Sequence, residues 1–506
     1  MVGFAVSNVV GLARQIIVSR TFGTSSDIDA LYAANRLPDL LFNLMAGGAL
    51  ASAYVPALTG FLARRDREAA WHLTSAIANL LTLVLTGIAA VAWLASPWLV
   101  QRLFPFDDPA QAALTASLLR LLLPTTILFG LSGLLMGTLN AHRHFASPAL
   151  APAFYSLGWI LGSLLLAPSM GVYGLAWGVV LGAGLHLAAQ VPALLRLQPK
   201  YHLDLGLKNP SVREVGMLLP PRVLGVAVVQ INFLVNTIIA TSQPEGSLTA
   251  ITVAFVIMLM PQVLIAQSMA IASMPTFSAQ VALGRMDEMR ASLARTLRGV
   301  VFLSLPASLG LILLRRPVVS LLFERGAFDS QSTELVAWAL LWYAAGLVGH
   351  SLLEITSRAF YALHDTRTPA FVGTAAMSLN LLLSLTFSAL FQWIGWAPHG
   401  GLALANSTAT ALEVAVLILL IRRRLGGIGR ELLSGTMRAV GAAALMGMGL
   451  GVWIATTRGL PTWVVGLGGV VLGAGIYWVG GLILGAPESR QLPRFLLTRG
   501  RRPVQE

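Results

Sequence analysis

Long apolar stretches fill most of the chain, and short polar stretches separate them. A helix that crosses a membrane needs about 20 apolar residues, whereas a barrel strand would alternate apolar and polar positions over about ten residues. Fourteen stretches meet the helical requirement: 3–22, 29–62, 71–98, 111–140, 148–168, 171–195, 214–240, 248–279, 292–314, 333–362, 370–394, 400–421, 438–456 and 462–484. The pattern therefore predicts an all-α polytopic membrane protein with fourteen transmembrane helices.

The composition agrees with this fold class. Hydrophobic residues make up 56% of the 506 residues and charged residues only 11%, whereas a soluble protein carries about 25% charged residues. Cysteine is absent, which excludes disulfides, thiolate metal sites and cysteine catalysis.

Positive charge is divided unevenly between alternate loops. Lysine and arginine concentrate in the cytoplasmic loops of membrane proteins. One set of loops contains Arg64, Arg65, Arg67, Arg143, Lys200, Lys208, Arg285, Arg290, Arg367, Arg422, Arg423 and Arg424; the opposite set contains Arg20, Arg102, Arg315, Arg316, Arg325 and Arg458. We therefore predict that both termini are cytoplasmic. We expect the basic tail to contact anionic phospholipids, and we expect no nucleic-acid partner.

The two halves of the chain show a weak internal repeat. "NAHRHFASPA" (140–149) and "YALHDTRTPA" (361–370) share Ala, six intervening residues and Pro-Ala, and each closes a long apolar stretch. An offset of six helices preserves orientation, so a parallel pseudo-repeat is expected. The predicted organisation has a first lobe of helices 1–6 (1–197), a cytoplasmic linker (198–213) and a second lobe of helices 7–12 (214–424). Two additional helices (425–485) and a basic cytoplasmic tail (486–506) complete it.

Arg14 is the most informative polar residue, because it lies inside the first apolar stretch. An arginine at membrane depth costs about 2.5–3.5 kcal/mol, so it usually has a partner or a function. Its planar guanidinium suits a phosphate, which it binds through two parallel hydrogen bonds. Either Arg14 binds an anionic substrate, or it forms a structural pair with Asp29 or Asp39 of the second helix.

Several other polar residues also lie within predicted spans. Arg36 and Asp39 are one turn apart and are expected to pair locally; Asp39 is also a candidate for proton or cation coupling. Gln230 and Asn232 are candidates for substrate contact or helix packing. Glu354 and Arg358 lie on one helical face with His350, which favours a local ion pair or a contact between lobes. Arg120, Arg222, Asn236 and Glu413 are further polar residues in predicted spans.

Motifs for catalysis are missing from the sequence. It contains no phosphate-binding P-loop, no metal-binding histidine spacing and no recognisable pair of nucleophile and base. We therefore predict a transporter rather than an enzyme, without a cofactor.

Several stretches resemble one family, the MurJ/MviN lipid II flippases. They are "GLARQIIVSRTFG" (11–23), "DALYAANRLPDLL" (29–41), "GALASAYVP" (48–56), "LPPRVLGVAVVQINFLVNTIIA" (219–240), "LLFERGAFD" (321–329) and "SRAFYALHDTRTP" (357–369). The last two are the most specific, and the resemblance covers nearly the whole chain in order.

The resemblance implies an exporter fold of the multidrug/oligosaccharidyl-lipid/polysaccharide superfamily in a bacterial inner membrane. Two lobes would enclose a cationic cavity, and helices 13 and 14 would form a groove for a polyprenyl tail. The substrate would be lipid II, moved from the cytoplasmic to the outer leaflet by alternating access. Arg14 and Asp29 match the family's "GLAR" arginine and "DA" acidic residue. Transport would be coupled to the membrane potential or to a gradient of Na⁺, H⁺ or Cl⁻.

The sequence departs from the family at other cavity arginines. Asn8, Val256 and the Phe42–Asn43 region occupy such positions, and Gln15 replaces an acidic residue. Arg36 and Arg222 are candidates to compensate for the lost charge. The departure keeps two other functions open: export of another undecaprenyl-linked saccharide, or drug/cation antiport. A third alternative is a non-transporting scaffold that binds cell-wall synthesis proteins.

Overall fold

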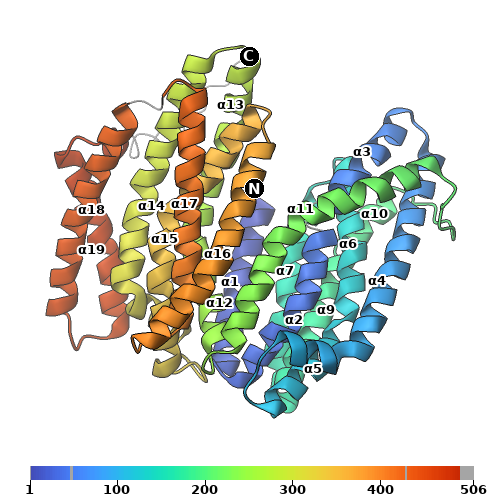
Figure 1. Cartoon of the computed structure of the whole chain (residues 1–506), viewed down its shortest axis with the longest axis horizontal. Helices are drawn as coiled ribbons and strands as arrows, with labels where there is room; N and C mark the ends of the chain where they lie inside the picture. Colours follow the sequence, from blue (N-terminus) through green and yellow to red (C-terminus); the bar gives the residue numbers. More distant parts are fainter. Residues whose placement is uncertain (1, 46–48, 428–429, 491–506) are drawn as a thin grey trace. The chain divides into compact units, whose positions relative to one another are not determined.

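The computed structural model describes residues 2–45, 49–427 and 430–490, and every regular element in these ranges is a helix (Figure 1). The chain divides into two compact units. Unit 1 comprises Met1–Thr249 with Arg325–Ser332, and unit 2 comprises Ala250–Glu324 with Thr333–Glu506.

Unit 1 contains α1 to α11. Their bounds are α1 Val2–Phe22, α2 Ser26–Met45, α3 Ala49–Ala63, α4 Arg67–Leu103, α5 Pro109–Leu122, α6 Pro124–Ala141, α7 Ala146–Leu161, the π-helix η1 Gly162–Leu166, α8 Ala167–Met170, α9 Val172–Ala188, α10 Val191–Arg196 and α11 Pro210–Thr241. The expected second lobe starts at residue 214, but α11 packs against α2 and α3 within unit 1. The packing units therefore divide the chain about one helix later than the predicted lobes.

Unit 2 contains nearly all of α12 and the helices that follow it. Their bounds are α12 Ser247–Gln262, the π-helix η2 Val263–Gln267, α13 Ser268–Ala282, α14 Met286–Phe323, α15 Ser330–Ala362, α16 Arg367–Trp393, α17 His399–Arg424, α18 Arg430–Thr456 and α19 Thr462–Ile483. Pro261 lies two residues before η2. Proline lacks the N–H that a helix requires, so it disturbs the helical hydrogen bonds.

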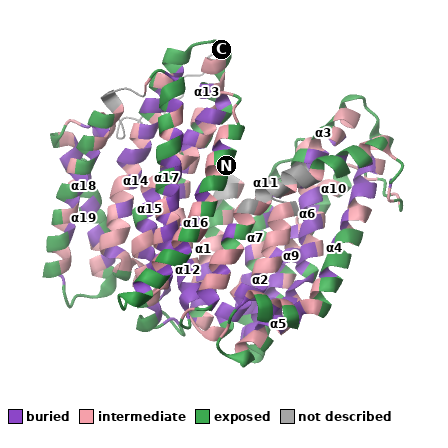
Figure 2. Ribbon diagram, viewed as in Figure 1, coloured by how far each residue is buried: buried purple, intermediate pink, exposed green. Residues whose placement is uncertain are grey.

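Eleven of the described helices are long and apolar enough to cross a membrane. Large apolar side chains cover the outer surface of several of them, for example Leu83, Val91 and Leu94 on α4. Figure 2 shows exposed residues along α4. A soluble protein rarely exposes an apolar surface of this extent, and the chain is therefore a multi-pass membrane protein.

Tight contact between two backbone segments organises one end of unit 1. Ala327 N donates to Arg20 O at 2.9 Å. Gly23 and Gly326 both have positive φ, and a Cβ at Gly23 would lie 2.4 Å from Ala327 O. Only glycine combines this conformation with so close an approach. The "SRTFG" and "ERGAFD" segments are therefore joined because neither glycine has a side chain.

Candidate functional site

Arg14 lies on α1 with its guanidinium over an aromatic ring of α7. Its Cζ atom is 5.3 Å from the centre of the Trp159 ring, a distance at which a cation is attracted by the ring face. The residue is half-buried. Within the described residues, no carboxylate oxygen lies within 4.0 Å of its guanidinium nitrogens. The structure thus places Arg14 on a tryptophan and not in a close pair with Asp29 or Asp39.

Aromatic side chains extend from Trp159 into a continuous wall. Tyr32 of α2 stacks on Trp159 with ring centres 6.4 Å apart, and Tyr155 meets the same ring edge-on at 6.2 Å. Phe129 of α6 continues the wall at 5.0 Å from Tyr155. Gln15, next to Arg14, donates from Nε2 to Tyr32 Oη at 3.0 Å. These contacts position α1 and α2 against α7, with Arg14 at the edge of the wall.

Asp39 is the carboxylate of this polar region, and one neighbouring amide holds it. Asn35 Nδ2 donates to Asp39 Oδ2 at 2.9 Å, whereas Asn43 Nδ2 donates to the main-chain carbonyl of Asp39 at 2.8 Å. The charges of both Arg36 and Arg14 act on Asp39. The negative charge of Asp39 therefore reduces the positive potential of the region, although Asp39 forms no close ion pair with Arg14.

The expected local pair of Arg36 and Asp39 is not formed, because both side chains have other partners. The Arg36 Cζ atom lies 4.8 Å from the centre of the Phe233 ring on α11, and Asp39 accepts from Asn35. The Nε atom of Arg36 is buried without a hydrogen-bond partner among the described residues. Arg36 and Arg14 are thus two cations that each rest on an aromatic ring.

Asp29 holds the loop before α12 and the first turn of α12. It accepts from Gly246 N and from Thr249 N, both at 2.8 Å, and from Thr249 Oγ1 at 2.5 Å. Its side chain is buried. Because these three donors occupy both carboxylate oxygens, the structure gives Asp29 a scaffolding role; its predicted contact with substrate stays a prediction.

The candidates on α11 differ in what the structure describes. Asn236 Nδ2 donates to Asn232 O at 3.0 Å and to Asn232 Oδ1 at 3.1 Å, and Asn232 is buried. Gln230 is half-buried. Arg222 belongs to α11 by its backbone, but its side chain lies outside the described residues. Their predicted contact with substrate stays a prediction.

Glu354 and Arg358 form the expected local ion pair in unit 2. Arg358 Nη2 lies 3.2 Å from Glu354 Oε2, one turn apart on α15. On the same helix, His350 Nε2 is 3.0 Å from Asn406 Oδ1 of α17. The His350 contact joins α15 to α17, and a role of the Glu354–Arg358 pair between lobes stays a prediction.

Unit 2 also contains an apolar groove of about 600 Å³. Five helical elements line it: α12 through Pro261, η2 through Leu264, α14 through Ala307 and Leu311, and α18 and α19 through residues that include Met446 and Val470. Its lining contains no charged residue. A hydrocarbon chain suits this groove because burying apolar surface gains about 25 cal/mol per Å².

The residues that the structure describes contain no group of three or more His, Asp or Glu side chains placed to hold a metal ion. The two arginines that rest on aromatic rings belong to unit 1, and the apolar groove belongs to unit 2. Sequence analysis identified Arg14, Arg36 and Asp39, but it missed Trp159, Tyr155, Tyr32 and Asn35. Ordinary membrane helices contain these residue types, so only the three-dimensional contacts single them out.

Three comparisons place this architecture among known proteins. The family model "Lipid II flippase MurJ" matches residues 18–469. The lipid II flippase MurJ of Burkholderia cenocepacia is 31% identical over 426 residues, which cover 83% of this chain and 81% of that protein. The probable lipid II flippase MurJ of Rhizobium meliloti is 30% identical over 470 residues, which cover 89% of this chain and 85% of that protein.

Solved structures share the fold. A lipid II flippase MurJ in an inward closed conformation has a TM-score of 0.81 at 21% identity and covers 97% of this chain and 98% of its own. An inward-facing multidrug resistance MATE transporter of the MOP superfamily has a TM-score of 0.69 at 17% identity, covering 83% of this chain and 94% of its own. The match of the family model over most of the chain, together with these relatives, shows that the chain belongs to the lipid II flippase MurJ family.

Proposed function

We propose that this protein moves lipid II from the cytoplasmic to the outer leaflet of a bacterial inner membrane by alternating access. The observation that carries the proposal is Arg14: a guanidinium at membrane depth that rests on Trp159 and has no close carboxylate among the described residues. Such a group keeps its charge and offers a planar fork to a pyrophosphate. Arg36, on Phe233, would add a second cation.

The groove of unit 2 would receive the polyprenyl tail. It is apolar throughout, and α18 and α19 form part of its wall. Carrying the tail in a hydrocarbon groove keeps it out of water while the headgroup crosses, and each buried CH₂ contributes about 0.8 kcal/mol. Binding of the tail would explain why the chain has the predicted helices 13 and 14 in addition to the two lobes.

We infer fourteen spans with both termini in the cytoplasm. Eleven helices satisfy length and composition. The remaining three would be α1, the α2–α3 segment and α11. Four charged residues, Asp27, Asp29, Arg36 and Asp39, lie within the 20 residues of α2, as expected of a helix that lines a transport path.

The membrane potential would supply part of the driving force. Moving one charge through 100 mV is worth about 2.3 kcal/mol, and an interior-negative potential favours outward movement of an anion. Coupling to Na⁺, H⁺ or Cl⁻ would add to this, with Asp39 as the carboxylate of the cluster. The proposal requires no cofactor and no catalytic step.

A second candidate is export of another undecaprenyl-linked saccharide or of a drug. The observation that favours it is the smaller positive charge: Asn8, Val256 and the Phe42–Asn43 region occupy three positions where the resemblance implies arginines. The experiment uses the full chain in liposomes with fluorescent lipid II, and in parallel with an undecaprenyl-pyrophosphate oligosaccharide that lacks the peptide. Faster movement of lipid II supports the proposal. Movement of the oligosaccharide alone supports the second candidate. Movement of neither, with retention of cell-wall synthesis proteins on the purified chain, supports a scaffold.

A further inference from the structure

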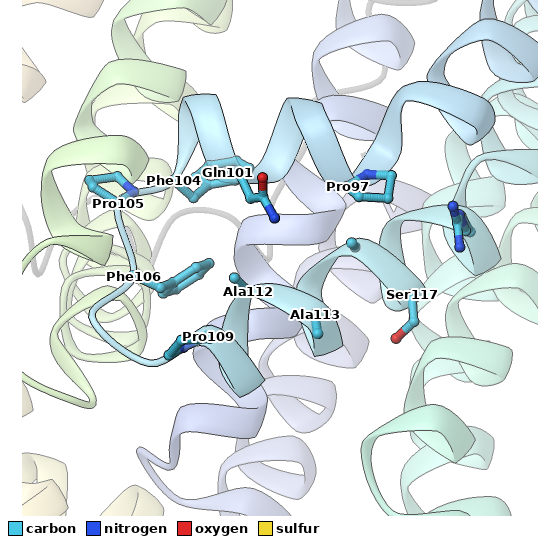
Figure 3. A pocket seen from close by; sticks show the side chains of 11 residues that line it. Pro97, Gln101, Phe104, Pro105, Phe106, Pro109, Ala112, Ala113 and Ser117 are labelled. Carbon is cyan, nitrogen blue, oxygen red and sulfur yellow. The ribbon is translucent and has the colours of Figure 1, made fainter.

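A pocket of about 490 Å³ lies where α4 turns into α5, in unit 1 (Figure 3). Pro97 and Gln101 of α4 line one side, and Ala113 and Ser117 of α5 line the other, with Phe106 of the connection between them. Arg120 completes the lining, which contains no acidic residue. The pocket is separate from Arg14, which does not line it.

Pro97 explains how Arg120 is held in place. In a helix, the carbonyl of Trp93 would accept from the N–H of residue 97, and proline has none. Arg120 Nε donates to the free Trp93 O at 3.1 Å, and Ser96 Oγ donates to it at 3.0 Å. The guanidinium also lies on the Trp93 ring, with Cζ 4.9 Å from its centre. The carbonyl that Pro97 leaves free in α4 therefore fixes the direction of the Arg120 side chain.

The charge of Arg120 is not neutralised by the protein. Among the described residues, no carboxylate lies within 4.0 Å of it, and its Nη nitrogens make no hydrogen bond. The carboxylate at the start of α5, Asp108, accepts from Ala110 N at 2.8 Å and does not line the pocket. Two pairs of N–H groups thus remain for an external anion, in the planar geometry that suits a phosphate.

The surrounding side chains place the pocket at headgroup depth. α4 has 37 residues, which corresponds to about 55 Å, so it extends beyond a hydrocarbon core of about 30 Å. Trp93 and Trp98 are 49% and 61% exposed, and Tyr173 of α9, 40% exposed, hydrogen-bonds to Ser117 at 2.7 Å. Exposed tryptophan and tyrosine mark the interface between hydrocarbon and water. Leu94, 73% exposed, continues into the apolar surface of α4.

We propose that this pocket binds the phosphate of an anionic membrane phospholipid through Arg120, as a site distinct from any transport path. Gln101 supplies hydrogen bonds to the glycerol portion, and the acyl chains lie along the exposed face of α4. The pocket prefers phosphatidylglycerol to phosphatidylethanolamine, because its lining offers no carboxylate to the ethanolamine ammonium group. This inference does not depend on the substrate that the protein transports.

The test measures lipid binding to the full chain in a neutral detergent, by native mass spectrometry and by the shift of the unfolding temperature. Phosphatidylglycerol is expected to bind at least fivefold more tightly than phosphatidylethanolamine. Arg120→Gln removes this preference, whereas Arg102→Gln keeps it, since Arg102 is an exposed arginine near the same end of α4 and does not line the pocket. Glycerol phosphate without acyl chains binds at least tenfold more weakly than the lipid; equal binding would overturn the lipid assignment in favour of a free phosphate site.

Ala113→Trp provides a variant that keeps Arg120. Ala113 is exposed and lines the pocket, so a larger side chain fills the space without disturbing the core. We expect this variant to unfold at the wild-type temperature without lipid and to lose the phosphatidylglycerol shift. If both Arg120→Gln and Ala113→Trp bind phosphatidylglycerol as the wild type does, the proposal is wrong. If Arg120→Gln does not fold, the binding of phosphatidylglycerol to Ala113→Trp alone decides whether the proposal holds.

Discussion

Arg14 of α1 rests on the ring of Trp159 of α7, with 5.3 Å between its Cζ atom and the ring centre. This contact holds a cation in place without neutralising it, because the ring contributes a quadrupole and no net charge. A carboxylate at the same position would hold Arg14 equally well but would compete with an anionic substrate. The tryptophan therefore makes anion binding compatible with a stable position of the arginine.

The ring should matter for substrate affinity. Trp159→Leu removes the aromatic face, and an interaction of this kind is worth about 0.5–1 kcal/mol, so lipid II affinity should fall about two- to fivefold. Trp159→Phe keeps a face and should retain most of the affinity. The measurement is lipid II binding to the purified variants. Equal affinity for wild type and Trp159→Leu would show that the ring does not support the cation.

Asp29 should behave as a structural residue. Asp29→Ala leaves Gly246 N, Thr249 N and Thr249 Oγ1 without their acceptor, and each buried unsatisfied donor costs about 1–3 kcal/mol. We expect a loss of about 3 kcal/mol or more in the free energy of unfolding, seen as a lower unfolding temperature in detergent. Asp27→Asn, on the exposed side of the same turn, is the matched control. A variant that unfolds like wild type but no longer binds lipid II would instead place Asp29 at the substrate.

Gly23 should tolerate no side chain, because of the backbone that it meets. Gly23→Ala brings a Cβ within 2.4 Å of Ala327 O, whereas Gly284, with a φ of +70°, has nothing within 4 Å of an added Cβ. A side chain at a left-handed position costs about 1–2 kcal/mol. We therefore expect the unfolding temperature to fall clearly further for Gly23→Ala than for Gly284→Ala. Equal effects would mean that the 324–329 loop moves away from the added Cβ without a loss of stability.

Asp365 should make stability depend on pH below about 4. Hydrogen bonds from Thr368, and then the charge of Arg424, lower the pKa of Asp365 from its ordinary value. A lowered pKa contributes stability above the unfolded pKa of about 3.9, and this contribution disappears as the pH falls through the folded pKa. The difference in unfolding temperature between wild type and Asp365→Asn should thus be present at pH 7 and shrink towards pH 3. A difference that stays constant with pH would contradict this.

The sequence predicted what depends on apolar length and local spacing. Uninterrupted apolar runs predicted the helices, because a hydrocarbon solvent requires every backbone group to bond within its own helix. The pair of Glu354 and Arg358 followed from a spacing of one turn. The family followed from motifs such as "LLFERGAFD", whose glycine the structure explains by the approach of Gly326 to Arg20.

Interactions between residues that are distant in the sequence could not be predicted from apolar length or local spacing. Arg36 and Asp39 have the spacing of a local pair, yet the Arg36 guanidinium lies over Phe233 of another helix. The role of Asp29 depends on a loop 220 residues away in the sequence. The position of Arg120 depends on the missing N–H of Pro97 in another helix. In each case a partner from elsewhere in the chain decides the outcome, and one sequence contains no direct record of that partner.

The most direct test of the central claim is the rate at which the full chain moves fluorescent lipid II in liposomes, compared between Arg14→Gln and Arg20→Gln. Arg20 is the matched control, because it is the exposed arginine on the same helix. Losing a charged hydrogen bond costs about 1.5–3 kcal/mol, so Arg14→Gln should slow movement about tenfold or more, while Arg20→Gln should keep the wild-type rate. Wild-type rates for a correctly folded Arg14→Gln protein would contradict the account.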